Sequence, residues 1–133
     1  MKKLYALVLG ATFLMVAGVA FAGGAPAPAN TPELKRVIGA NGKSTIIFFQ
    51  NPNGGPCKMQ KEVLDKLLSE RKSNFNIAAV STMKQEDQKA YYDYGIRSLP
   101  SLVLVDKNGK IVRVFAPGIQ SADVLTTALD GLK

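Results

Sequence analysis

Cys57 is the residue of this chain best suited to nucleophilic chemistry, and it lies in the stretch QNPNGGPCKMQ at residues 50–60. It is the only cysteine, and the sequence contains no histidine. An intramolecular disulfide therefore cannot form, and no imidazole is present to act as a base or a metal ligand. A single thiol in an oxidising compartment can still form a mixed disulfide, pair with another molecule or be oxidised to sulfenic acid.

The sequence leaves the accessibility of Cys57 open. The helix that begins beside it, together with Lys58, favours the thiolate, whereas burial favours the neutral thiol. Cys57, Leu64 and Leu68 share one helical face, which directs the sulfur partly toward the core. The alternative to a reactive thiol is therefore a small buried hydrophobe. Met59 is a second soft ligand, but its spacing from Cys57 aims the two sulfurs poorly at one ion, so we predict no metal site.

The N-terminus has the pattern of a bacterial export signal, because Lys2 and Lys3 precede an uncharged apolar run that ends in AFA. The small residues of that tripeptide predict cleavage after Ala22, which makes residues 1–22 a signal peptide. The alternative is an uncleaved anchor, since the run is just long enough to cross a bilayer. The positive-inside rule puts the rest of the chain outside in either case, in the periplasm or secreted. Membrane contact is expected only through an uncleaved signal segment.

The rest of the chain has the size and composition of one domain. Its 111 residues suffice for a single core. Two of the 17 basic residues leave with the signal segment, so the net charge falls from +7 to +5. Basic residues never form a run longer than two and do not alternate with aromatic residues, so we predict no nucleic-acid partner. Residues 23–31 are rich in Gly, Pro and Ala and predict a flexible tether with nothing to bury. The domain is expected at 32–133, with Thr31 as the N-cap of its first helix.

The hydrophobic period alternates between strand and helix along the domain, which predicts an α/β fold. This alternation favours parallel pairing, while Asn108-Gly109 supplies the positive φ angles of a tight hairpin and hence an antiparallel edge. One mixed sheet between helices follows. The expected elements are a helix at 32–42, a strand at 44–50, a helix at 57–72, a strand at 75–81, a helix at 84–95, a hairpin of 101–106 with 111–115, and a helix at 121–132.

This order of elements, with a cysteine at the start of the second helix, resembles the thioredoxin family. Two stretches carry the resemblance: STIIFFQNPNGGPCKMQKEVLDKL at 44–67 and YGIRSLPSLVLVDKNGKIV at 94–112. Their order and spacing also fit, so the likeness extends over nearly all of residues 33–133. It implies a thioredoxin-like fold, in which helices cover both faces of a mixed central sheet of parallel strands and an antiparallel edge hairpin.

The departures from the family pattern bear on function. The family's active site reads W-C-G-P-C-K, and these six positions are occupied here by NGGPCK at 53–58. Gly54 stands where the family has its nucleophilic cysteine, and Cys57 stands where it has the resolving cysteine. Asn53 replaces the tryptophan, and Phe48 aligns with the buried acid that assists proton transfer. Three parts of a dithiol oxidoreductase are therefore missing, and we expect no efficient turnover.

The segment GGP before Cys57 is interpreted as retained turn geometry. Glycine would allow a strained backbone conformation where the chain approaches its neighbours closely, and Pro56 would start the helix. The candidate thiol site then consists of Cys57 with Pro56 and Lys58 beside it.

A second candidate site comes from Pro100. The resemblance implies a cis bond between Leu99 and Pro100, in a loop that lies against the active-site segment and pairs with extended substrate peptides. Such pairing uses main-chain groups and needs no second cysteine. Asn53, Gly54, Gly55, Leu99 and Pro100 are therefore predicted to frame a shallow groove for polypeptide.

Two functions remain open. The first is an exported thioredoxin-like thiol protein in which Cys57 forms mixed disulfides with protein or small-molecule thiol partners. The second is a redox-inactive module that keeps the fold and binds polypeptide in the groove beside Leu99-Pro100. Neither function requires a cofactor, and none is predicted.

Overall fold

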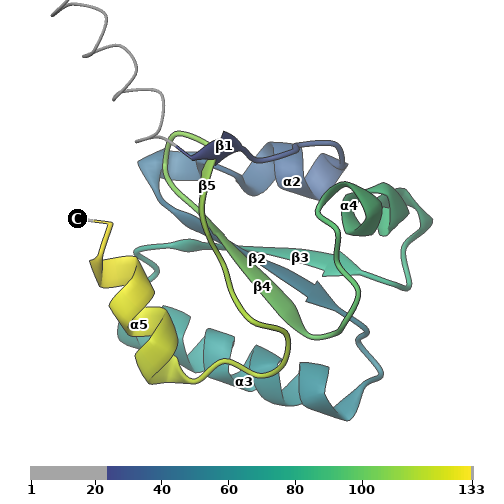
Figure 1. Cartoon of the computed structure of the whole chain (residues 1–133). Helices are drawn as coiled ribbons and strands as arrows, with labels where there is room; N and C mark the ends of the chain where they lie inside the picture. The colour runs from purple at the N-terminus through teal and green to yellow at the C-terminus, as the bar shows by residue number, and fades with distance from the viewer. Residues whose placement is uncertain (1–23, 133) are drawn as a thin grey trace, which may run out of the picture.

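The computed structural model describes residues 24–132 (Figure 1). The predicted signal peptide at 1–22 lies outside the described residues. No helix within 24–132 is long and apolar enough to cross a membrane.

A five-stranded sheet forms the centre of the domain, in the order β1-β5-β4-β2-β3. Strand β2 pairs in parallel with β3 on one side and antiparallel with β4 on the other. Strand β5 continues the sheet antiparallel to β4. The strands are β1 (Ala25–Pro26), β2 (Thr45–Gln50), β3 (Asn76–Ser81), β4 (Ser101–Val105) and β5 (Lys110–Val114).

Helices cover both faces of this sheet (Figure 1). Helices α3 and α5 lie on one face, and α2 and α4 lie on the other. The mixed sheet between two helical layers confirms the predicted fold class. The helices are α2 (Pro32–Val37), α3 (Gly55–Glu70), α4 (Gln88–Asp93) and α5 (Ala122–Asp130), with 3₁₀ turns at Ala40–Gly42 and Gln85–Asp87.

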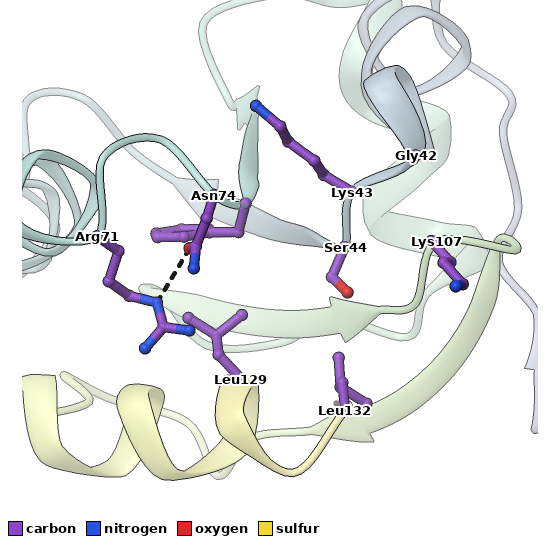
Figure 2. Close-up of a pocket in the computed structure, with 9 residues that line it drawn as sticks. Gly42, Lys43, Ser44, Arg71, Asn74, Lys107, Leu129 and Leu132 are labelled. Carbon is purple, nitrogen blue, oxygen red and sulfur yellow. Dashed lines mark hydrogen bonds between the residues drawn. The ribbon is translucent and has the colours of Figure 1, made fainter.

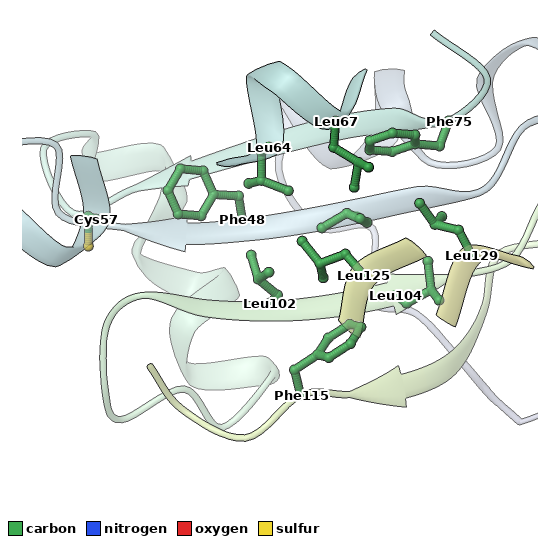
Figure 3. Packing of buried hydrophobic residues seen from close by; sticks show 11 residues of the cluster. Phe48, Cys57, Leu64, Leu67, Phe75, Leu102, Leu104, Phe115, Leu125 and Leu129 are labelled. Atoms are coloured by element: carbon green, nitrogen blue, oxygen red, sulfur yellow. The ribbon is translucent and has the colours of Figure 1, made fainter. Parts of the chain in front are cut away.

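The apolar run of β2 supplies side chains to two cores. Successive strand residues point to opposite faces, so Ile46 and Phe48 pack under α3 and α5, while Ile47 and Phe49 pack under α2 and α4. All four side chains are buried. Figure 3 shows the first of these cores, which extends from Phe75 at one end to Cys57 at the other. A strand buried on both faces therefore explains the absence of polar alternation in the sequence.

The direction of β4 differs from the parallel pairing that the alternation of strands and helices favours. Among the strands that the structure describes, β2 and β3 form the one parallel pair. Strand β4 runs antiparallel to β2, with Ser101 at the start of β4 opposite Phe49 near the end of β2. The start of β4 consequently lies beside the end of β2. Pro100, which precedes Ser101, is brought to the same end of the sheet as the loop before α3.

The segment at 25–30 also differs from the predicted tether. Ala25 and Pro26 pair with Ile111 and Lys110 of β5, and the Ala27 amide donates to the Gly109 carbonyl at 2.9 Å. Tyr94 Oη donates to the Pro28 carbonyl at 2.7 Å. Composition rich in Ala and Pro suggested that nothing is buried, but the segment docks through its main chain, which composition does not report.

Local signals at helix and turn boundaries explain where several elements begin. Thr31 caps α2, since its Oγ1 accepts from the Leu34 amide at 3.1 Å. Ser121 caps α5 in the same way through the Val124 amide at 3.3 Å. The hairpin between β4 and β5 turns at Gly109, whose φ of 82° suits glycine. Asn108 does not have a positive φ, so the prediction of positive angles at both residues is wrong for Asn108, whose amide donates to Asp106 Oδ1 at 2.9 Å.

We predict that Tyr94→Phe lowers the free energy of unfolding by about 0.5–1.5 kcal/mol, because it removes the hydrogen bond to the Pro28 carbonyl. Urea unfolding followed by circular dichroism measures the change. Tyr92→Phe is the matched control, since Tyr92 is 86% exposed. Equal stabilities for the two variants would mean that residues 25–30 do not dock on the domain.

Candidate functional site

The loop between β2 and α3 holds the candidate thiol at the first turn of a helix. The Gly54 amide donates to the Asn51 carbonyl at 2.9 Å, and the Asn53 amide donates to Asn51 Oδ1 at 3.1 Å. These bonds close a tight turn, after which α3 begins at Gly55, two residues earlier than predicted. Cys57 therefore lies within the first turn of α3.

Cys57 is buried, with 3% of its surface exposed. The Asn51 amide donates to its Sγ at 3.4 Å. Its side chain belongs to the apolar cluster of Figure 3, to which Phe48 also belongs. The structure thus answers the question of accessibility that the sequence left open. Phe48, at the position of the family's buried acid, contributes an apolar ring and no proton acceptor.

Gly54 does not occupy a conformation that requires glycine. Its φ and ψ of −82° and 137° lie in the extended region open to any residue. A Cβ placed on Gly54 would lie 3.4 Å from the Asn51 carbonyl oxygen and 3.8 Å from Cys57 Sγ, which are ordinary contacts. A Cβ on Gly55 would meet nothing within 4 Å. The interpretation that the glycines of GGP are needed for a strained backbone conformation is therefore wrong. A side chain at position 54 could be accommodated beside the Cys57 sulfur.

The remaining residues of the loop face solvent. Asn53, Gly55, Pro56 and Lys58 are exposed. Pro56 occupies the first turn of α3, where its missing amide hydrogen leaves no intrahelical bond unmade. Lys58 follows Cys57 and has no ion pair among the residues that the structure describes.

The loop that contains Pro100 lies at the same end of the sheet. The Leu99-Pro100 peptide bond is cis. Leu99 is half-buried and packs against the cluster that contains Cys57, and the Pro100 carbonyl accepts from the Gly118 amide at 3.0 Å. The two segments that the sequence proposed as one site, residues 53–58 and Leu99-Pro100, thus share one end of the sheet through Cys57 and Leu99, while Pro100 itself is buried.

Gln60 was not identified from the sequence. Its side chain is fully buried one turn after Cys57, and its amide group spans to the main chain of Gln120. Oε1 accepts from the Gln120 amide at 2.6 Å, and Nε2 donates to the Gln120 carbonyl at 3.1 Å. The available signal was its position, because Gln60 precedes Leu64 by four residues and hence occupies the apolar face of α3.

Two further polar side chains support the ends of β2 and β3. Asp87 is 1% exposed, and its Oδ2 accepts from the Ser81 amide at 2.9 Å. The Tyr91 hydroxyl lies 2.8 Å from the Gln50 carbonyl and 3.0 Å from the Val80 carbonyl. Burial, with smaller contributions from the charges of Asp87 and Cys57, raises the pKa of Tyr91 to about 12. Tyr91 also packs against Phe49, with the two ring centroids 5.5 Å apart.

A basic cavity lies at the opposite end of the sheet (Figure 2), with a volume of about 190 Å³. Lys43 Nζ donates to the Ser73 carbonyl at 2.8 Å, and Arg71 bonds to Asp130 at 3.0 Å and to Asn74 at 3.1 Å. These bonds connect the segment after α3 with Lys43 and with α5, so Lys43 and Arg71 have a structural role there. Within the described residues no group of three His, Cys, Asp or Glu could hold a metal ion.

Comparison with known proteins supports the resemblance seen in the sequence. The family model of a thioredoxin-like domain matches residues 32–133. The chain is 31% identical over 83 residues to thioredoxin of Haemophilus influenzae, which covers 62% of this chain and 75% of that protein. It is 26% identical over 98 residues to the chloroplastic M-type thioredoxin of Chlamydomonas reinhardtii, with coverage of 74% and 68%.

Solved structures show the same fold. A thioredoxin-like protein from Clostridium perfringens superposes with a TM-score of 0.64 at 22% identity, covering 81% of this chain and 82% of that one. Thioredoxin-2, a component of malaria parasite protein secretion machinery, superposes with a TM-score of 0.60 at 19% identity, covering 67% and 82%. Identities this low establish the fold alone.

We predict that Gly54→Cys forms a disulfide with Cys57 under mild oxidation, because its Cβ would lie 3.8 Å from Sγ in a conformation open to any residue. Thiol titration of the unfolded protein should show the loss of both thiols. The control is Gly55→Cys, whose Cβ would point into open space and whose two thiols should remain titratable. Two free thiols in oxidised Gly54→Cys would contradict the geometry of the loop.

The raised pKa of Tyr91 predicts a loss of stability in alkali. A tyrosine that ionises at about 12 when folded and at 10.0 when unfolded stabilises the fold fully below pH 10, and this contribution is lost as the pH rises toward 12. Tyr91→Phe should therefore lose less free energy of unfolding than the parent between about pH 9 and about pH 11. Urea unfolding at both pH values tests this. An identical decline in the two proteins would contradict the assignment.

Proposed function

The chain belongs to the thioredoxin-like domain family, and on that premise we propose an exported thiol protein that binds polypeptide and forms single mixed disulfides at Cys57. It does not run a dithiol cycle. The family acts on protein thiols, which supports a polypeptide or other thiol-containing partner.

The space beside Cys57 carries this proposal. A Cβ on Gly54 would lie 3.8 Å from Sγ, but glycine leaves that position without a side chain. A partner's sulfur could therefore approach Cys57 from the side where the family's first cysteine stands. Cys57 lies in the first turn of α3, and the Asn51 amide donates a hydrogen bond to its Sγ at 3.4 Å.

The chemistry at Cys57 is one exchange step. The Cys57 thiol releases its proton to solvent, and the thiolate attacks one sulfur of a partner disulfide. The partner's S–S bond breaks as the bond to Cys57 forms, and the second partner sulfur leaves as a thiolate. The sequence supplies no second thiol to resolve the product, so release requires an external thiol such as a reduced small molecule.

We expect the groove for the partner to lie between the loop residues Asn53, Gly54 and Gly55 and the segment Leu99-Pro100. Asn53 and Gly55 are exposed, Gly54 and Leu99 are half-buried, and Pro100 is buried. An extended peptide pairs through main-chain groups in this mode of recognition. Exposed Ile119 (42%) and Met59 (57%) add apolar surface on the loop before α5 and on α3. The sequence pattern at 1–22, which predicts an export signal, supports a periplasmic or extracellular site of action.

The burial of Cys57 favours a second candidate function. With 3% of its surface exposed, the thiol is covered in the closed domain. A redox-inactive module would keep the groove beside Leu99-Pro100 for polypeptide and use Cys57 only as part of the core.

Glutathione disulfide tests the two candidates. The proposed thiol function predicts a stoichiometric glutathione adduct on the folded protein, detected by mass spectrometry, that reduced glutathione reverses. Cys57→Ser should give no adduct and should keep the fold, because serine and cysteine differ little in size. Catalytic reduction of insulin should remain near background, since each cycle needs the missing resolving thiol.

Each outcome assigns a function. An adduct that forms only after unfolding would favour the redox-inactive module. Insulin reduction at the rate of an ordinary thioredoxin would refute the absence of a dithiol cycle.

A further inference from the structure

The loop between β5 and α5 is fastened to the rest of the domain at two points. Gln60 on α3 bonds both the amide and the carbonyl of Gln120, at 2.6 and 3.1 Å. Two residues earlier, the Gly118 amide donates to the Pro100 carbonyl at 3.0 Å. Figure 1 shows this loop running alongside α3 before the chain enters α5. The loop therefore links the helix that carries Cys57 to the segment that carries Pro100.

The side-chain amide of Gln60 is chemically matched to the main-chain groups that it contacts on Gln120. It is fully buried on the apolar face of α3, where a polar side chain loses its hydration unless it is hydrogen-bonded. Its amide presents one donor and one acceptor, which match the carbonyl and the amide of Gln120. An apolar side chain would leave both main-chain groups of Gln120 without these partners.

The position of this contact relates it to the thiol. Cys57 and Gln60 are three residues apart on α3 and are neighbours on one helical face. Phe115 and Leu125, which flank the loop, belong to the same buried cluster as Cys57 (Figure 3). The loop thus begins and ends beside residues of the cluster to which Cys57 belongs.

We propose that Gln60 is a positioning residue that holds the loop at 116–120 against α3, sets the distance between Cys57 and the Leu99-Pro100 segment, and controls access to the thiol. Opening the Gln60–Gln120 contact releases the loop at 116–120 and exposes Sγ of Cys57. This inference rests on the proposed function for its purpose. Its test uses alkylation by iodoacetamide, which requires only an exposed thiol and no partner disulfide.

The test compares Gln60→Met with Ser121→Ala. Methionine keeps the length of the side chain but makes neither bond to Gln120, whereas Ser121→Ala removes the N-cap of the adjacent α5 and leaves the contact in place. Both proteins are adjusted with urea to the same small unfolded fraction. We expect Cys57 of Gln60→Met to alkylate at least about tenfold faster than Cys57 of Ser121→Ala, because it opens locally. Equal rates would show that Cys57 reacts only through global unfolding and would overturn the proposal.

The unmodified protein gives a second test that does not depend on a folded variant. Amide exchange of Gln120, measured by NMR, reports how often the contact opens. The slowing of Cys57 alkylation relative to the unfolded protein should match the protection factor of the Gln120 amide to within about threefold. A thiol far better protected than Gln120 would overturn the proposal. Failure to form a glutathione adduct while these values agree would refute the thiol function and leave the positioning role intact.

Discussion

The double pairing of β2 is the constraint on which the rest of the domain depends. This strand is hydrogen-bonded to β3 on one edge and β4 on the other, and its residues from Thr45 to Phe49 are buried. Its main chain and side chains are therefore fixed on four sides. The loop after Gln50 consequently leaves the sheet at the C-terminal end of β2. Because β4 is antiparallel to β2, its start, and Pro100 before it, lie at that same end of the sheet. The candidate site therefore depends on this register, because its two segments, residues 53–58 and Leu99-Pro100, are far apart in the sequence.

The sequence predicted the layers of the fold because they follow from hydrophobic period and turn chemistry. The apolar run at 44–50, the helical spacing of Val63, Leu64 and Leu67, and Gly109 at the hairpin turn each favour the element that the structure forms there. The docking of Ala25–Pro26 on β5 could not be predicted in this way, because main-chain pairing leaves no trace in composition. The antiparallel direction of β4 depends on tertiary pairing, which local periodicity does not encode.

The candidate site was predictable in its residues and not in its environment. The family motif identified Cys57 and Pro100, but the burial of the thiol depends on chain segments far from it in sequence. Gln60 illustrates the limit, since its spacing from Leu64 places it on the apolar face of α3 but does not identify its partner, the main chain of Gln120. Gly54 illustrates the opposite error, because glycine suggested a strained backbone where the observed φ of −82° is open to any residue.

The pairing of β1 with β5 also limits how far the domain can stand from a membrane. Only Gly23 and Gly24 lie between the predicted cleavage position after Ala22 and the first paired residue, Ala25. Two residues span roughly 7 Å at full extension. A chain that kept its leader as an anchor would hold the folded domain against the lipid headgroups, with the β1 edge of the sheet nearest the surface. An anchor of this kind would restrict the orientations in which the candidate groove faces the aqueous compartment, whereas cleavage after Ala22 would free the domain to rotate.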